Sequence, residues 1–155
     1  MWRALVLGLV TGMRSQLPAA LLAWRQSQGV LPEEIAGPVR IFKRRGAVPL
    51  LTLAAVGELV GDKLPTAPSR MESGPFLGRL SLGATAGAGI ASAFGRSRIL
   101  GGLFGMAGAA AGSVLGLRYR ESMAQGTDTP DGVWALLEDI VAVALGLAAT
   151  RGPTA

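Results

Sequence analysis

The chain has 155 residues, of which 50% are hydrophobic and only 16% are charged, and its mean hydropathy is +0.43. This composition is too apolar and too poor in charge for an average soluble domain, so we expect one integral membrane domain covering residues 1–155. The absence of cysteine and histidine excludes disulfides, thiolate and imidazole metal sites, and mechanisms that need a cysteine nucleophile or a histidine base. We therefore expect no metal, no cofactor and no enzymatic activity.

The net charge of +5 comes from basic residues that lie mainly between the apolar runs. That distribution is typical of loops at anionic lipid headgroups, and it argues against a nucleic-acid partner. Membrane lipids are the expected partners.

Residues 2–24 form the first apolar segment, which is long enough to cross a membrane. Polar residues and a proline interrupt it at Arg14, Ser15, Gln16 and Pro18, so we predict a broken or kinked helix. The alternative is a cleaved secretory signal, because Arg3 precedes the apolar stretch. No Ala-x-Ala site follows closely and the apolar pattern resumes after the break, which favours the broken helix.

Residues 25–45 form a polar connection, in which Pro32 and the two acidic residues after it predict a short surface helix. The second apolar segment, residues 46–61, is short for a perpendicular span. Residues 64–79 contain three prolines and predict an irregular loop.

Residues 80–117 form two apolar runs made almost entirely of glycine, alanine, leucine and serine, separated by a turn at residues 96–98. So short a connection makes the two helices antiparallel neighbours. Interior glycines weaken water-soluble helices, whereas in a bilayer they let helix backbones approach closely. The spacing of these glycines predicts close helix packing, and the alternative is that they line a pore or a sliding surface. The glycines concerned are Gly83, Gly87, Gly101, Gly105, Gly108, Gly112 and Gly116.

A hydrophilic loop, residues 118–132, precedes the fifth apolar segment, residues 133–150. The predicted fold is therefore all-α: a polytopic helical membrane protein with about five apolar segments, a broken first helix and a tightly packed glycine-rich hairpin. Five crossings place the termini on opposite sides of the membrane, and the basic residues favour the C-terminus in the cytoplasm. This orientation does not hold if the first segment is re-entrant.

Ionisable residues within the apolar segments are the candidate chemistry. Glu58 and Asp62 are four residues apart, which places both carboxylates on one helix face, with Lys63 beside them. Glu138 and Asp139 lie a third of the way into the fifth segment, so at least one of them faces protein or water. Burying such charges costs several kcal/mol unless each is paired or neutralised.

Arg14, in the break of the first helix, and Arg79, at the start of the third segment, are the expected partners of these carboxylates. One interpretation is a polar cluster where broken helices meet inside the membrane, as in small transporters. The alternative is that Glu58, Asp62, Lys63 and Arg79 lie at the headgroup level and tie loops to helix ends.

The residues around Glu58 also carry a resemblance. The run GELVGDKLP, residues 57–65, is followed by Arg70, Arg79 and the glycine-rich hairpin. This pattern resembles an uncharacterised family of small bacterial integral membrane proteins, a domain of unknown function with a Glu-x-x-x-Asp-Lys-x-Pro signature. The resemblance covers nearly the whole chain and implies a multi-pass protein of a bacterial inner membrane, without implying a reaction. The positions that match the pattern are Arg14, Glu58, Asp62, Lys63, Pro65, Arg70 and Arg79.

Two hypotheses of function follow. In the first, a small transporter, channel or lipid-handling protein binds or translocates a small charged solute, ion or lipid headgroup at the Arg/Glu/Asp cluster, and works as a homo-oligomer. In the second, a non-transporting accessory or structural subunit docks a partner through its glycine-rich helices. Catalysis in the membrane comes third, because the chain lacks histidine and cysteine.

Overall fold

The computed structural model describes residues 1–31, 44, 46–61, 72–126 and 131–152. All regular structure within these residues is helical, which confirms the all-α prediction. The helices are α1 (Trp2–Met13), α2 (Leu17–Ser27), α3 (Ala47–Gly61), α4 (Ser73–Ala93), α5 (Arg98–Gly126) and α6 (Asp131–Ala149).

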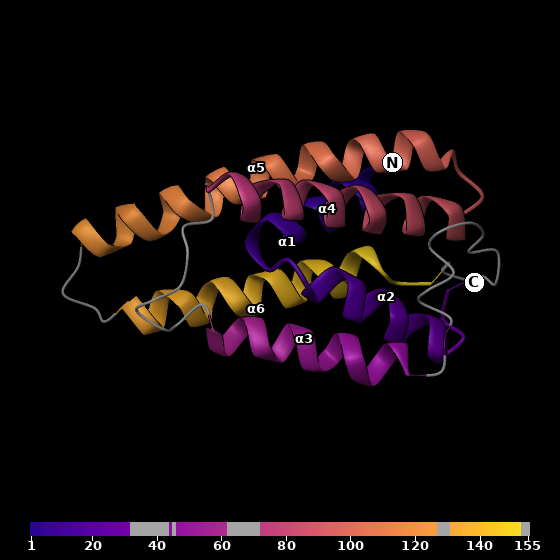
Figure 1. Cartoon of the computed structure of the whole chain (residues 1–155), viewed down its shortest axis with the longest axis horizontal. Coiled ribbons are helices and arrows are strands. Elements are labelled where there is room, and N and C mark those ends of the chain that lie inside the picture. The colour runs from indigo at the N-terminus through magenta and orange to yellow at the C-terminus, as the bar shows by residue number, and fades with distance from the viewer. Residues whose placement is uncertain (32–43, 45, 62–71, 127–130, 153–155) are drawn as a thin grey trace.

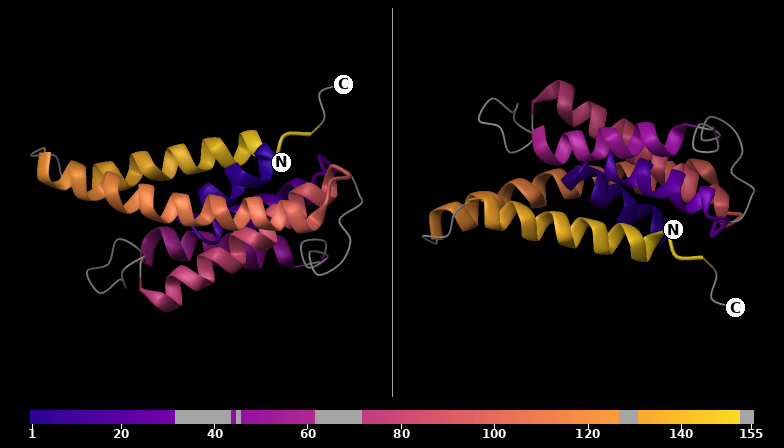
Figure 2. Two further views of the ribbon diagram at one scale, coloured as in Figure 1. Left: turned by 90° about the horizontal axis from the view of Figure 1, so that it is seen from above. Right: turned by 90° about the horizontal axis from the view of Figure 1, so that it is seen from below.

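Helices α1 and α2 form a hairpin that enters the bundle and turns back (Figures 1 and 2). Arg3, at the start of α1, donates hydrogen bonds to the carbonyl oxygen of Ala149, at 3.0 Å, and to that of Arg151, both at the end of α6. Val30, just after α2, lies beside Gly152 at the same end of the molecule. The first apolar segment therefore begins and ends at one end of the bundle.

Trp2 and Gly152, near the two ends of the described chain, therefore lie at the same end of the bundle, which is the arrangement expected for a re-entrant first segment and not for a continuous crossing. The reason is that the break reverses the direction of the chain instead of kinking a continuous helix. Phe94, just after α4, also lies here, with its ring centroid 4.2 Å from the guanidinium of Arg3. We call this end, marked by Arg3, Phe94 and Ala149, the terminal end, and the opposite end, where Tyr119 contacts Trp134 edge to face, the distal end.

Helix α5 packs against α4 on one side and α1 on the other, with glycines at both contacts. A Cβ atom at Gly101 would lie 2.6 Å from the carbonyl oxygen of Gly87, and one at Gly83 would lie 2.8 Å from that of Gly105. On the other side, a Cβ atom at Gly8 would lie 2.9 Å from the Cα of Gly105. Because no side chain fits at these positions, the backbones of the three helices are in direct contact.

Two later glycines of α5 contact α1 instead of α4. Gly108 and Gly112 lie against the backbone of α1, at Leu5 and Leu9, and Gly116 is buried. The glycine-rich segment therefore holds α1 as well as its own hairpin partner.

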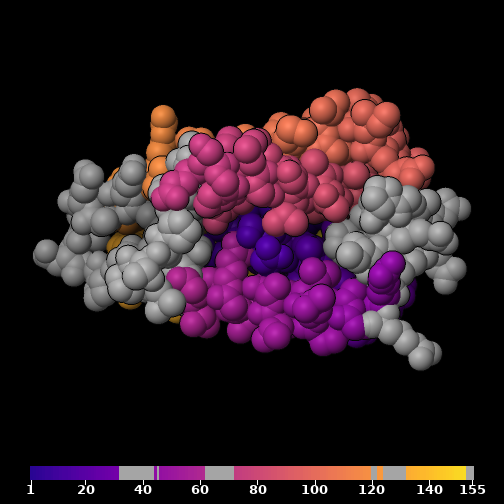
Figure 3. All heavy atoms as spheres, viewed as in Figure 1, coloured from indigo at the N-terminus to yellow at the C-terminus, as the bar shows by residue number. Residues whose placement is uncertain are grey.

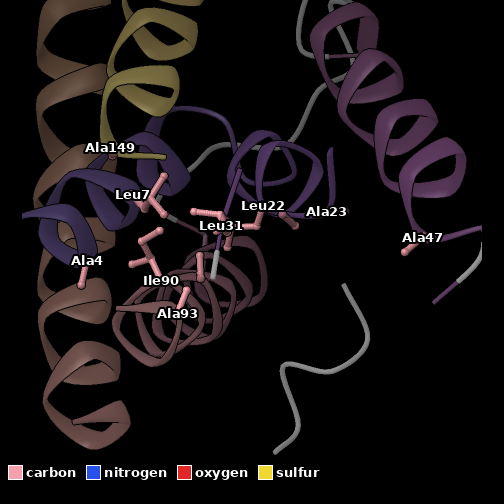
Figure 4. Close-up of a cluster of buried hydrophobic side chains, with 11 residues drawn as sticks. Ala4, Leu7, Leu22, Ala23, Leu31, Ala47, Ile90, Ala93 and Ala149 are labelled. Atoms are coloured by element: carbon pink, nitrogen blue, oxygen red, sulfur yellow. The ribbon is translucent and has the colours of Figure 1, made fainter. Parts of the chain in front are cut away.

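The interior is made largely of small residues, and many large apolar side chains point outward. The cluster in Figure 4 joins small side chains such as Ala4, Ala93 and Ala149 with a few larger ones such as Leu7 and Ile90. Large apolar side chains are exposed along α3, α5 and α6, among them Leu50, Leu53, Val60, Ile99, Leu103, Leu136 and Ile140. Two described segments, Arg98–Tyr119 and Gly132–Ala149, are long and apolar enough to cross a membrane.

Two predicted loop boundaries are wrong. Helix α4 begins at Ser73, within the stretch predicted to be irregular up to Arg79, because Pro75 lies in its first turn, where proline is tolerated. Helix α5 continues to Gly126, beyond the predicted end of the apolar run at residue 117. The short helix predicted at Pro32 lies outside the described residues.

Candidate functional site

The break between α1 and α2 is the centre of the site. Arg14 follows α1 in an extended conformation, with φ −138° and ψ 101°, and α2 begins at Leu17. Pro18 lies in the first turn of α2. In a continuous helix, the Pro18 ring would clash with the carbonyl group of Arg14. Pro18 also has no N–H group that could donate a hydrogen bond to this carbonyl. The break was predicted at these residues, and it leaves backbone N–H groups for other partners.

Glu58 of α3 binds the backbone of this break. One carboxylate oxygen accepts hydrogen bonds from the N–H and the hydroxyl of Ser15, both at 2.7 Å, and the other accepts one from the N–H of Gln16 at 2.8 Å. Gln16 is the N-cap of α2, so the carboxylate lies at the positive end of that helix.

Arg79 of α4 approaches the same carboxylate. Its Nη2 atom lies 3.8 Å from Oε1 of Glu58, and the two side chains are 8% and 11% exposed. Figure 3 shows a furrow between α3 and α4 with atoms of the α1–α2 segment, in indigo, at its floor. The pair Glu58–Arg79 joins the two helices that border this furrow.

Arg14 forms the deeper part of the site. Its Nε donates a hydrogen bond to Oδ1 of Asp139 at 2.5 Å, and its Nη2 lies 3.6 Å from Oε2 of Glu138. Its Nη1 also donates to the carbonyl oxygen of Met13, at the end of α1. The Arg14 side chain is only 1% exposed, so this guanidinium is compensated by protein groups.

These contacts bring five of the predicted residues together, namely Arg14, Glu58, Arg79, Glu138 and Asp139, which we call the charged cluster. Asp139 lies ten residues from the end of α6, or about 15 Å along the helix axis, which is near the middle of α6. Glu58 and Arg79 lie closer to the ends of their own helices, but their contacts with the break place them at this same level. They do not lie at an end of the bundle.

The other predicted site residues, Asp62, Lys63 and Arg70, lie outside the described residues. Within the described part of the chain, no group of three acidic, histidine or cysteine side chains is arranged to hold a metal ion.

The backbone of the break is a part of the candidate site that the sequence pattern does not reveal. The sequence predicts the break and marks Glu58 as a candidate, but it does not identify the N–H groups of Ser15 and Gln16 as the partners of Glu58. The signal was available, because a helix restart leaves unpaired N–H groups and a carboxylate in an apolar helix needs donors.

Comparison of the chain with family models, curated proteins and solved structures found no match. The resemblance to an uncharacterised membrane protein family therefore stays a hypothesis.

Proposed function

We propose that this chain is a multi-pass protein of a bacterial inner membrane that binds and translocates a small charged solute at the charged cluster. The distribution of side chains supports the membrane part of this proposal. Large apolar residues face outward on α3, α5 and α6, while Arg14, Arg79, Glu138 and Asp139 are buried. Water favours the opposite arrangement, whereas a bilayer favours this one.

The basic residues support one orientation in the membrane. Most of them belong to helix ends at the terminal end or to the sequence that connects two of these ends: Arg3, Arg25, Arg40, Lys43, Arg44, Arg45, Arg96, Arg98 and Arg151. Fewer lie in segments that flank the distal end: Lys63, Arg70, Arg118 and Arg120. By the positive-inside rule, the terminal end is cytoplasmic and both termini are inside the cell.

The observation that carries the transport proposal is the meeting of two half-helices at buried charges. The last carbonyl group of α1 accepts a hydrogen bond from Arg14, and the N–H groups at the start of α2 donate to Glu58. Discontinuous helices that end at the level of the bilayer centre form substrate and ion sites in secondary transporters, because their free backbone groups bind charge.

The charge of the cluster favours a cation. The charged residues that the structure describes there are two arginines and three carboxylates, Glu58, Glu138 and Asp139. A low-dielectric site with this composition gains more from a proton or a small alkali cation than from an anion. We therefore name a small monovalent cation as the preferred solute.

The accessory-subunit hypothesis receives less support. It assigns the glycines to partner docking, but Gly83, Gly87, Gly101 and Gly105 are already in contact with each other inside the bundle. The outward apolar faces of α3, α5 and α6 are compatible with a homo-oligomer, which would form through those faces.

Flux through proteoliposomes tests this proposal. The unmutated protein should conduct H⁺, Na⁺ or K⁺ faster than protein-free vesicles, and Glu138→Gln should reduce the flux to the protein-free rate because it removes a buried charge from the cluster. Glu72→Gln is the matched control, since Glu72 is an exposed carboxylate at the start of α4. Each variant is first shown to elute as a folded species. No flux of any of these cations, or a fully conducting Glu138→Gln variant, would contradict the proposal.

A further inference from the structure

A groove of about 310 Å³ lies between α2 and α3. The two helices run antiparallel, so Leu17 faces Leu59 at one end of the groove and Trp24 faces Thr52 at the other. Its lining is apolar apart from the Thr52 hydroxyl and the Trp24 N–H, and its middle is formed by Ala20, Leu21, Ala55 and Val56. From Leu17 to Trp24 it extends about 10 Å along α2.

The inner end of the groove adjoins the charged cluster. Leu17 follows Gln16, the N-cap residue of α2. Leu59 follows Glu58, whose carboxylate accepts a hydrogen bond from the N–H of Gln16. The outer end opens toward the terminal end of the bundle, where α2 finishes and α3 begins.

The outer end carries a cation with an unused donor. The guanidinium of Arg25 lies 4.8 Å from the centre of the Trp24 ring, which itself lines the groove. The Nε atom of Arg25 is buried and has no hydrogen-bond acceptor among the residues that the structure describes. The Arg25 side chain as a whole is only partly buried, and phosphate is the acceptor that a guanidinium binds best. Arg44, exposed just before α3, adds positive charge at this end.

We propose that this groove binds an anionic phospholipid, with its phosphate on Arg25 beside Trp24 and one acyl chain along the groove. The inference rests on the membrane placement proposed above, but not on transport. Tryptophan and arginine together mark the headgroup level of a bilayer, which suits the phosphate end.

The charge at the outer end favours a lipid over a second protein, because Arg25 and Arg44 lie beside an apolar groove and match an anionic headgroup there. A second apolar groove, between α4 and α5, includes Arg98 in its lining, but no aromatic residue lines it, and Arg98 already interacts with another group of the protein. Arg98 is therefore the matched control for Arg25.

Native mass spectrometry of the purified protein, extracted from vesicles that contain equal amounts of phosphatidylglycerol and phosphatidylcholine, tests the site. The unmutated protein should retain phosphatidylglycerol selectively. Arg25→Gln should weaken that retention about ten-fold, as expected for the loss of one charge-assisted hydrogen bond, whereas Arg98→Gln should leave it unchanged. Val56→Trp, which fills the groove from an exposed position, should weaken retention of both lipids.

Equal loss in the Arg25 and Arg98 variants would show only a general effect of surface charge and would overturn the site. Unchanged lipid retention in Val56→Trp would also overturn the site. If Val56→Trp instead changes the oligomeric mass and retains the lipid, the groove is a protein interface and the lipid site is overturned. A protein that conducts cations but retains no phosphatidylglycerol would overturn the lipid site and leave the transport proposal standing. Selective retention of phosphatidylglycerol without cation flux would support the lipid site and overturn the transport proposal.

Discussion

At the scale of single residues, Arg14 links the two halves of the first segment to the rest of the bundle. It donates to the last carbonyl group of α1 and to Asp139, and it lies close to Glu138. It is among the largest of the fully buried side chains. The cost of burying charge was enough to predict from sequence that Arg14 and Arg79 pair with the carboxylates. Which arginine meets which carboxylate could not be predicted, because that depends on the direction of α2.

Replacing Arg14 by glutamine leaves two buried carboxylates without this guanidinium. We expect Arg14→Gln to lower the free energy of unfolding by about 3–5 kcal/mol, the usual cost of breaking a buried ion pair. Arg118→Gln, which changes an exposed arginine on α5, should change it by less than about 1 kcal/mol. Denaturant unfolding in detergent measures both values, and equal effects would show that the ion pairs of Arg14 do not stabilise the fold.

At the scale of helices, α5 is the element that the others pack around. Its glycines contact α4 through Gly83 and Gly87, and α1 through Gly8 and Gly12. The spacing of glycines predicted that backbones approach closely, and it predicted the antiparallel hairpin. It did not identify α1 as the second partner, because a Gly-x-x-x-Gly pattern specifies how close a helix comes but not which helix it is.

The glycines of α5 differ in how much room surrounds them, and this gives a test on one helix. A Cβ atom at Gly105 would lie 3.0 Å from the Cα of Gly87 and closer still to the carbonyl oxygen of Gly83, whereas one at Gly102 would have no neighbour nearer than 3.5 Å. Gly105→Ala should therefore destabilise the protein by about 3 kcal/mol through overpacking.

Gly102→Ala should be neutral or stabilising by up to about 1 kcal/mol, because alanine favours a helix. Thermal unfolding of the two variants in the same detergent compares them directly. If both variants melt alike, close backbone contact at Gly105 does not contribute to stability.

At the scale of the whole molecule, the first segment decides the topology. A kinked crossing helix and a hairpin that turns back need the same break residues, so the sequence pattern at Arg14 and Pro18 could not separate them. Long-range contacts, such as those of Arg3 with Ala149 and Arg151, distinguish the hairpin from the kinked helix. With the hairpin in place, the charged cluster lies level with the middle of α6.

The most direct test of this account is the side of the membrane on which each end of the α1–α2 hairpin lies. The chain contains no cysteine, so Trp2→Cys and Ser27→Cys, both at exposed positions, can be labelled in bacterial cells with a thiol reagent that does not cross membranes. Ser122→Cys, exposed near the distal end of α5, reports the opposite side. We predict that Trp2→Cys and Ser27→Cys are both protected in intact cells and labelled after lysis, while Ser122→Cys is labelled from outside. Labelling of Trp2→Cys and Ser27→Cys from opposite sides would contradict the hairpin.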